Sequence, residues 1–335
     1  MPTMHDVARQ ARVSIATVSH VINNTRPVSD ELRTRVLDAM AALNYQPNAF
    51  ARALRSKQSL TIGVIVPDSS NPFFADLMRG IEDVSLENEY SVMLGESRGD
   101  LNKEIVHTEN LVAKQVDGII FAAAGAGAAH IEKLVDQGVP VVLVERDPKT
   151  LPVDAVLISN FEGGQLAARH LLALGHTQIA CITGPKRLTL REDRLRGFVT
   201  ALAEAGITLD ADHIREGNFS THSGYQHAQA LLRLAPRPTA IFAFNDMMAL
   251  GVLRAAHELG IAVPDDLSIV GFDDTYLAAY AIPPLTTITL PTHEMGRCAM
   301  QLLLDRINNP ELAPRKITLD ITLTVRHSTA PAPAS

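Results

Sequence analysis

Residues 4–23 read MHDVARQARVSIATVSHVIN, a pattern typical of two short helices separated by a sharp break. Thr3 can cap the first helix, because Asp6 follows three residues later and completes a capping box. Ser14 can cap a second helix that begins at Ile15 and ends near residue 22. Each helix has one apolar face and therefore needs a partner. The residues of these faces are Val7, Ala8, Ala11, Val18, Val21 and Ile22.

A third amphipathic segment completes a small helical unit. It begins at Asp30, with Ser29 as its expected cap, and ends near Leu43. Helices this short are not stable alone, so the three must pack together. Three small helices with a tight turn between the first two form a helix-turn-helix, in which the second helix enters the DNA major groove. Periodicity alone leaves the alternative of an ordinary helical subdomain open.

The order of residue types in this stretch is more specific than its periodicity. It closely resembles the N-terminal domain of the LacI family of transcriptional regulators, in segments 6–8, 13–14, 16–21, 28–29 and 43–49. The resemblance continues into the rest of the chain. It implies a homodimer whose two heads bind the halves of a pseudo-palindromic operator, because one short recognition helix reads too few base pairs.

The resemblance also implies which residues of the head meet DNA. Family specificity is set mainly at the positions of Ile15, Ala16 and His20. The first two can make only apolar contacts, for instance with thymine methyl groups, whereas His20 can hydrogen-bond a purine edge. Phosphate contacts, which fix the register, are expected from Thr17, Ser19 and Asn23. The predicted set further contains Ser14, Arg26 and Tyr45.

The net charge of −7 at pH 7 is unevenly spread along the chain. Residues 1–60 carry eight Lys or Arg and four Asp or Glu side chains, a net charge of +4, which leaves −11 for the rest. Phosphate contacts need only a local basic surface, and an acidic body limits nonspecific binding to nucleic acid. The distribution favours a DNA-binding head on an acidic body.

A basic segment connects the head to the body. Residues 48–56 are helix-prone but too short to be stable as an isolated helix, so a plain linker is the alternative. The resemblance implies a hinge helix that orders when the dimer binds its operator. It places Leu54 as an apolar wedge at the central minor-groove step, with Arg52 and Arg55 available to phosphates or groove edges.

From residue 60 onward, apolar runs of strand length alternate with helical stretches. Continuous Val- and Ile-rich runs joined by helices predict parallel sheets that are covered on both faces, arranged as two doubly wound lobes. The expected strands are 60–66, 91–95, 117–122, 139–144, 179–183, 239–244 and 267–272. Helices are expected to end at Gly138, Gly175, Gly206 and Gly260.

The resemblance supplies the topology of this α/β body. It implies a type I fold like that of periplasmic sugar-binding proteins, with a ligand cleft between the lobes and strand crossings near residues 159, 289 and 320. The predicted boundaries are 1–46 for the all-α helix-turn-helix head, 47–59 for the hinge, 60–328 for the effector-binding and dimerisation domain, about 60–159 and 291–319 for its N-lobe, about 160–289 and 320–328 for its C-lobe, and 329–335 for a disordered tail.

Polar groups follow several of the predicted strands, at the edge where open parallel sheets bind ligands. Phe73 and Phe74 cannot both face one core, so one of them could stack on a sugar or a nucleobase. Asp246 and Asp274 would each more ordinarily cap a helix, but several such polar strand exits together indicate a polar cleft. The resemblance implies effector-binding roles for Asn71, Phe73, Phe74, Glu145, Arg146, Arg194, Phe219, Asn245 and Asp273.

The sequence indicates the chemical class of the effector less directly than it indicates the residues that bind it. A sugar is the expected ligand, with a sugar acid, a sugar phosphate or a purine as alternatives. Leu290 stands where several sugar-binding members carry glutamine, and Glu145 stands where aspartate is common. The Lys and Arg residues within 186–196 would suit an acidic effector, but a solvated helix face is the favoured interpretation.

No catalytic signature is present. The chain lacks a P-loop, a Gly-x-Ser-x-Gly elbow and a His-Glu-x-x-His motif, so an enzyme is not expected. Its histidines show no metal-ligand spacing, and neither metal nor cofactor is expected; Cys181 and Cys298 are expected to be buried free thiols. With no signal peptide or apolar membrane span, a cytoplasmic, nucleoid-associated protein is predicted.

The leading hypothesis is therefore a ligand-controlled transcriptional regulator, most simply a repressor. The alternative is a sugar-binding solute receptor without DNA function, which would carry a secretion signal and lack the basic head. A third class, an α/β enzyme of sugar or nucleotide metabolism, would need an acid/base pair or a cofactor loop.

Overall fold

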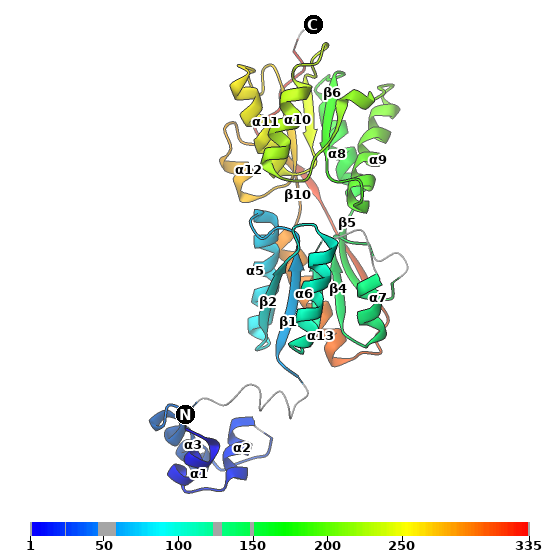
Figure 1. Cartoon of the computed structure of the whole chain (residues 1–335). Helices are drawn as coiled ribbons and strands as arrows, with labels where there is room; N and C mark the ends of the chain where they lie inside the picture. Colours follow the sequence, from blue (N-terminus) through cyan, green and yellow to red (C-terminus); the bar gives the residue numbers. More distant parts are fainter. Residues whose placement is uncertain (1, 24, 46–57, 123–128, 148–150, 334–335) are drawn as a thin grey trace. The chain divides into compact units, whose positions relative to one another are not determined.

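The computed structural model describes residues 2–23, 25–45, 58–122, 129–147 and 151–333 (Figure 1). The chain divides into two compact units, residues 1–60 and 61–335. Within the described ranges, every helix is too short or too polar to cross a membrane.

The head contains the three helices expected from the sequence, α1 (Met4–Ala11), α2 (Ile15–Asn23) and α3 (Asp30–Ala42). Their inward faces form one small core. Its fully buried residues come from all three helices, and Met40, Leu43 and Tyr45 pack against them. The buried set is Val7, Ala8, Ala11, Val18, Val21, Val36 and Ala39.

Local capping fixes the ends of these helices. The Asp6 N–H donates to the Thr3 hydroxyl, and the Thr3 N–H donates to the Asp6 carboxylate at 2.9 Å, which confirms the capping box. The Thr17 N–H donates to Ser14 Oγ at 3.0 Å, so the predicted cap of α2 is also confirmed. Ser29 occupies the N-cap position of α3 as expected, but its side chain makes no capping hydrogen bond.

The first lobe of the body is a six-stranded sheet in the order β11-β5-β4-β3-β1-β2, with every pair parallel. Its strands are β1 (Thr61–Val66), β2 (Ser91–Glu96), β3 (Gly118–Ala122), β4 (Val141–Val144), β5 (Asp154–Ile158) and β11 (Lys316–Leu319). Its helices are α5 (Pro72–Glu87), α6 (Leu101–Ala113), α7 (Ala129–Asp136) and α13 (Thr292–Asn308), which cover both faces (Figure 1).

The second lobe repeats this plan in the order β12-β10-β9-β8-β6-β7, with only β12 antiparallel to its neighbour. Its strands are β6 (Ile179–Thr183), β7 (Ile214–Glu216), β8 (Ala240–Ala243), β9 (Ser268–Asp273), β10 (Thr286–Thr289) and β12 (Thr322–Thr324). Its helices are α8 (Asn160–Ala173), α9 (Thr189–Glu204), α10 (Thr221–Leu231), α11 (Asp246–Glu258) and α12 (Tyr276–Tyr280), with a 3₁₀ turn at Ala211–His213.

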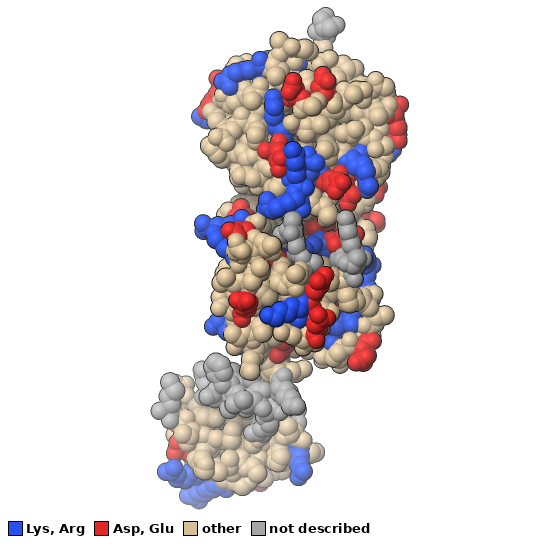
Figure 2. All heavy atoms as spheres, turned by 45° about the vertical axis from the view of Figure 1, so that its right-hand side comes forward, with Lys and Arg blue, Asp and Glu red and all other residues tan. Residues whose placement is uncertain are grey.

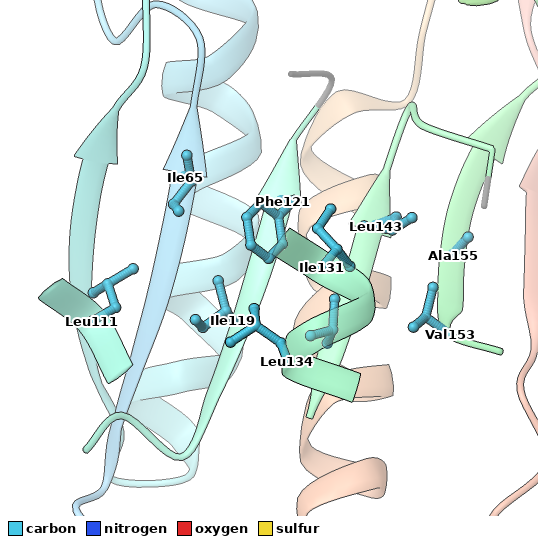
Figure 3. Packing of buried hydrophobic residues seen from close by; sticks show 10 residues of the cluster. Ile65, Leu111, Ile119, Phe121, Ile131, Leu134, Leu143, Val153 and Ala155 are labelled. Carbon is cyan, nitrogen blue, oxygen red and sulfur yellow. The ribbon is translucent and has the colours of Figure 1, made fainter. Parts of the chain in front are cut away.

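The chain passes between the two sheets three times, after β5, after β10 and after β11. Each lobe therefore has its own apolar core. Figure 3 shows the apolar core of the first lobe, which β1, β3, β4 and β5 form with α6 and α7. Phe121, Ile131 and Leu143 pack together there. Such cores hold the strand ends at fixed positions, and those ends carry the polar groups of the cleft.

Glycines allow the helices of the second lobe to approach very closely. A Cβ on Gly197 of α9 would lie 1.9 Å from the Phe161 carbonyl oxygen, and one on Gly164 of α8 would lie 2.1 Å from the Arg194 carbonyl oxygen. Only hydrogen fits at both positions. The α8–α9 crossing thus brings Asn160, at the start of α8, beside Arg194 of α9.

Two sequence-based expectations need correction. Strands β5, β7, β10, β11 and β12 were not among the expected ones, because they are short and contain charged residues or threonines instead of a continuous apolar run. The disordered tail is wrong for residues 329–332. Thr329 Oγ1 lies 3.0 Å from His170 Nε2, and the Ala332 N–H donates to the Leu174 carbonyl at 2.8 Å.

Candidate functional site

The outer face of α2 presents the residues expected to read DNA. Ile15 is 39% exposed although it is a large apolar residue, and Ala16 is also exposed, whereas Val18 and Val21 face the core. Ser14 and Arg26 are exposed as well, and His20 is half-buried. Figure 2 shows basic side chains gathered on the surface of the head. An exposed isoleucine on the outer face of this helix fits contact with base methyl groups.

Other predicted DNA-binding residues have different surroundings. Ser19 is only 9% exposed, and Tyr45 packs against the core of the head. Both would reach a phosphate only with the limited surface they expose. The side chain of Asn23 and the residues Arg52, Leu54 and Arg55 lie outside the described parts of the chain.

The body contains a cavity of about 910 Å³ to which both lobes contribute. Eight of the nine residues expected to bind an effector line it, and so does Leu290. The eight are Asn71, Phe73, Phe74, Glu145, Arg194, Phe219, Asn245 and Asp273. Segments far apart in sequence meet here because each follows a strand at the same sheet edge.

Arg146 is the exception, and its predicted role in binding the effector stays a prediction. It does not line the cavity; its guanidinium donates to the Glu104 carboxylate at 2.9 Å, and His130 Nε2 lies 2.8 Å from the same oxygen. Glu104 is fully buried, and hydrogen bonding and the nearby positive charge lower its pKa despite the opposing effect of burial. Glu145 points into the cavity, while its neighbour Arg146 pairs within the first lobe.

A buried polar network forms the inner end of the cavity. Glu145 accepts the Ile158 N–H at 3.0 Å and the Asn160 amide at 3.1 Å. Asn160 in turn accepts from Arg194 Nε at 3.1 Å, and Arg194 also donates to the Phe244 carbonyl. Asn160 therefore connects a carboxylate of the first lobe to a guanidinium of the second. No sequence pattern singled it out; the only signal was its position just after a lobe crossing.

Burial controls the charges in this network. Desolvation raises the pKa of Glu145 and lowers the pKa of Arg194 to about 10, so the guanidinium stays charged at neutral pH. Burial and the nearby Asp246 raise the pKa of Asp273 well above its usual value. Among the described residues, no side chain hydrogen-bonds the Asp273 carboxylate, which leaves it available to a ligand at the cavity wall.

Neither expected aspartate cap is present. Asn245 caps α11 instead, since its side chain accepts from the Met248 N–H at 2.9 Å. Asp246 is fully buried and accepts from the Thr275 N–H at 2.7 Å and the Thr287 hydroxyl at 2.6 Å. Asp274 instead accepts from Thr289 and pairs with Arg326. Both aspartates tie neighbouring segments together beneath the cavity.

Aromatic rings and unusual backbone conformations complete the site. Phe73 and Phe74 both line the cavity, with their rings edge to face at 5.0 Å between centroids. The backbone of Glu145, Phe219 and Asp273 is left-handed, with φ of 55°, 68° and 111°. Non-glycine residues rarely adopt positive φ, and such strain tends to occur at functional sites.

The cavity mouth is charged. Arg187 Nη2 of the second lobe donates to the Gly99 carbonyl of the first at 2.7 Å, so it bridges the lobes. The expected solvated face is only partly correct: Lys186 and Arg196 are exposed, but Arg187 lines the cavity and Arg194 is buried. Figure 2 shows Lys and Arg side chains beside Asp and Glu near the junction of the lobes.

This combination of a helix-turn-helix head and a two-lobed body with an interlobe cavity has counterparts among known proteins. Residues 3–48 match the model of bacterial regulatory proteins, lacI family, and residues 168–329 match the periplasmic binding protein-like domain. The chain is 42% identical over 332 residues to the HTH-type transcriptional regulator DegA of Bacillus subtilis, with 98% of both chains covered. The chain belongs to the LacI family.

Other LacI-family proteins match along similar lengths. The ribose operon repressor of Haemophilus influenzae is 40% identical over 329 residues, with 98% of each chain covered. The HTH-type transcriptional repressor PurR of Aliivibrio salmonicida is 39% identical over 312 residues, with 92% of this chain and 93% of its own length covered. Such coverage includes both head and body, so the chain is a DNA-binding transcriptional regulator of the LacI family.

Solved structures show the same architecture. The lac repressor dimer bound to operator and the anti-inducer ONPF matches with a TM-score of 0.88, 33% identity, and coverage of 98% of this chain and 99% of that chain. A LacI-family regulator from Enterococcus faecium with bound ribose matches 81% of this chain and 99% of its own, with a TM-score of 0.73 and 37% identity.

The free cysteines agree only in part with expectation. Cys181 is buried in β6, and its burial raises the pKa of the thiol to about 12, which makes it unreactive at neutral pH. Cys298 is a free thiol as expected, but it is only partly buried on α13.

Proposed function

We propose that this LacI-family regulator is a homodimeric, cytoplasmic repressor whose operator affinity is controlled by a neutral monosaccharide in the interlobe cavity. The network of Glu145, Asn160, Arg194 and Asp273 carries the proposal. It offers carboxylate and guanidinium groups within one partly aromatic cavity, a combination suited to gripping sugar hydroxyls and stacking on a sugar face.

The charge balance of the cavity supports a neutral effector. Its lining contains five Asp or Glu side chains but only three arginines, so an anionic sugar acid or sugar phosphate would find no excess of positive charge there, even with the Asp273 and Glu145 carboxyl groups protonated. Of the three arginines, Arg194 is already engaged with Asn160, and Arg187 donates to Gly99. Ribose is the first sugar to test, because the Haemophilus ribose operon repressor and the ribose-bound Enterococcus regulator are both similar to this chain.

A purine is the second candidate. The similarity to the purine repressor PurR favours it, and Phe73, Phe74 and Phe219 could stack on a base as well as on a sugar. The carboxylates of Glu145 and Asp273 could accept hydrogen bonds from either ligand. A direct comparison of ligands must therefore separate them.

A thermal-shift screen of the full chain tests the effector. D-ribose, further aldoses, a sugar acid, a sugar phosphate and hypoxanthine would be compared at equal concentration. A ligand at 100 times its dissociation constant stabilises the protein by about 2.7 kcal/mol, which is a shift of several degrees in Tm. A shift with a neutral sugar is expected; a shift with only the anionic sugars or only hypoxanthine would reject the proposed effector.

Operator control is tested separately by mobility shift. The operator is found by selecting bound duplexes from a random library, and binding is then measured with and without the stabilising ligand. The ligand should bind one relative arrangement of the two lobes more tightly than the other. It would thereby shift the equilibrium between the two arrangements and change the affinity for the operator. Selection of no sequence would overturn the regulator's predicted DNA contacts at Ile15, Ala16 and His20, whatever the effector.

The dimer is supported by an exposed apolar patch on the second lobe. Tyr276, Tyr280 and Ile282 are 66%, 81% and 93% exposed, which is unusual for large apolar side chains. We place the partner subunit on this patch. Ile282→Asp should convert the dimer to monomer in sedimentation analysis and weaken operator binding; an unchanged sedimentation coefficient would place the interface elsewhere. The two hinge segments of the dimer, each with its predicted residues Arg52, Leu54 and Arg55, would then act together on the operator.

A further inference from the structure

His20 is the only predicted base-reading residue with hydrogen-bonding atoms, and a second residue holds its ring. His20 Nδ1 lies 2.8 Å from Thr25 Oγ1, a normal hydrogen-bond distance. Thr25 is exposed, just beyond the end of α2. Among the described residues, the Thr25 hydroxyl has no other hydrogen-bond partner. The contact therefore fixes which edge of the imidazole faces away from the helix.

With Nδ1 occupied, Nε2 is the nitrogen left for a DNA base. A threonine hydroxyl can donate or accept, so it adapts to the protonation of the ring. Against a neutral ring it can donate to Nδ1, so that the ring proton sits on Nε2, or accept from Nδ1–H, which leaves Nε2 as an acceptor. Against an imidazolium it accepts from Nδ1–H, and Nε2 again carries a proton. Nε2 is therefore a hydrogen-bond donor in two of these three arrangements.

The hydrogen-bond acceptors that the bases expose in the major groove favour a His20 ring that donates from Nε2. Guanine offers two acceptors there, N7 and O6, while adenine and thymine offer one each, and cytosine offers only a donor. A donor at Nε2 thus matches guanine best and cytosine worst. Ile15 and Ala16 have no polar side-chain atoms, so a hydrogen-bonded base preference at this face depends on His20.

We propose that Thr25 is a positioning residue that holds His20 as a hydrogen-bond donor and thereby selects guanine at one position of each operator half-site. The inference rests on the operator binding proposed above. It adds a specificity determinant that does not itself touch the base.

Selection from a random duplex library with the full chain first defines the preferred sequence. Selection with His20→Ala then identifies the base pair at which the preference is lost. At that pair, guanine is replaced by 7-deazaguanine, which lacks the N7 acceptor. Wild-type binding should weaken roughly 2- to 13-fold, the range that one ordinary hydrogen bond supports, and His20→Ala should be insensitive to the replacement.

The positioning role is tested with Thr25→Val, which keeps the shape of the side chain and removes the hydroxyl. This variant should lose most of the guanine preference at that one pair while the preferences at other positions persist. Thr25→Ser should restore it. Thr34→Val is the matched control, because the Thr34 hydroxyl bonds only within α3, to the Asp30 carbonyl.

A spectroscopic readout separates positioning from general loss of structure. The ¹⁵N chemical shifts of the His20 ring in the free protein report which nitrogen carries the proton. Thr25→Val should alter these shifts, whereas Thr34→Val should not. A selection that prefers adenine or cytosine through an acceptor at Nε2 would overturn the inference, and so would a Thr25→Val variant with unchanged guanine preference.

These outcomes are distinct from failure of the proposed function. If the wild-type chain selects no sequence, operator binding itself fails. If His20→Ala retains every preference, base reading by His20 fails. If His20→Ala loses a preference that Thr25→Val keeps, only the role of Thr25 fails.

Discussion

The guanidinium carbon of Arg194 lies 3.2 Å from the centroid of the Phe272 ring, so the charged group lies over an aromatic face inside the second lobe. The Asn160 side chain and the Phe244 carbonyl accept its hydrogen bonds. This arrangement needs the planar fork of arginine, because an ammonium group can neither stack nor bond in two directions from one plane. Arg194 is thereby held rigid at the wall of the cavity before any ligand arrives.

Arg194→Lys keeps the positive charge but loses this geometry. Effector affinity should fall roughly 100-fold, since breaking a buried charged contact costs about 2–5 kcal/mol. Titration calorimetry with the ligand found in the thermal-shift screen measures the change. Arg196→Lys is the control, because Arg196 is on the same helix but exposed and paired with Asp193. Equal losses in both variants would contradict a specific role for Arg194.

Gly197→Ala should separate α8 from α9. Its Cβ would meet the Phe161 carbonyl oxygen at 1.9 Å, and such overpacking typically costs about 1–3 kcal/mol of unfolding free energy. Effector affinity should fall too, because the shift pulls Asn160 away from Arg194. Gly80→Ala on α5 makes a similar clash, 2.0 Å from the His293 carbonyl oxygen, but in the first lobe. Denaturant unfolding should show comparable losses, with a larger affinity loss for Gly197→Ala.

Arg187→Ala removes a hydrogen bond that bridges the lobes at the cavity mouth. The effector should dissociate faster by less than about tenfold, because an exposed hydrogen bond contributes only about 0.5–1.5 kcal/mol. Stopped-flow measurement of ligand release tests this. Lys186→Ala is the adjacent control, since Lys186 pairs with Glu216 of its own lobe. A release rate that Arg187→Ala leaves unchanged would show that the bridge does not restrain the cleft.

The buried His176, which contacts the C-terminal segment, should make the free energy of unfolding depend on pH. His176 is 1% exposed and contacts Thr239, Ser268 and the Ala330 carbonyl, and its burial lowers its pKa. The folded state therefore favours the neutral ring. The corresponding stability is fully present above the ordinary histidine pKa near 6.5 and is lost as pH falls below it.

Replacing His176 tests this directly. His176→Leu should lower the unfolding free energy by about 1–3 kcal/mol at pH 7.5, because its partners lose their hydrogen bonds. The difference from the wild type should shrink as pH falls toward 5. His222→Leu, at an exposed position on α10, should leave the pH profile unchanged. A difference from the wild type that stays constant between pH 7.5 and 5 would show that His176 does not titrate with folding.

Local sequence patterns were sufficient for much of the fold. The capping box at Thr3 and Asp6 and the Val/Ile-rich runs such as β1 and β4 act within a few residues, so their structure could be predicted from spacing alone. Strands such as β11 and β12 could not, because three or four residues form a strand only when a neighbouring strand offers its hydrogen bonds. The resemblance to the LacI family, rather than any pattern of the residues, placed the effector-binding groups.

The sequence by itself determined that a basic helical head precedes an acidic α/β body, since charge and hydrophobic periodicity are properties of the chain. Only the tertiary structure decided that Arg146 turns to Glu104 while Glu145 faces the cavity, and that Asn160 joins Glu145 to Arg194. It likewise decided that Asp246 holds two threonines instead of capping a helix. The physical reason is that a buried polar group takes whichever partner packing brings within hydrogen-bond distance, and these partners lie 15 to 42 residues away in the chain.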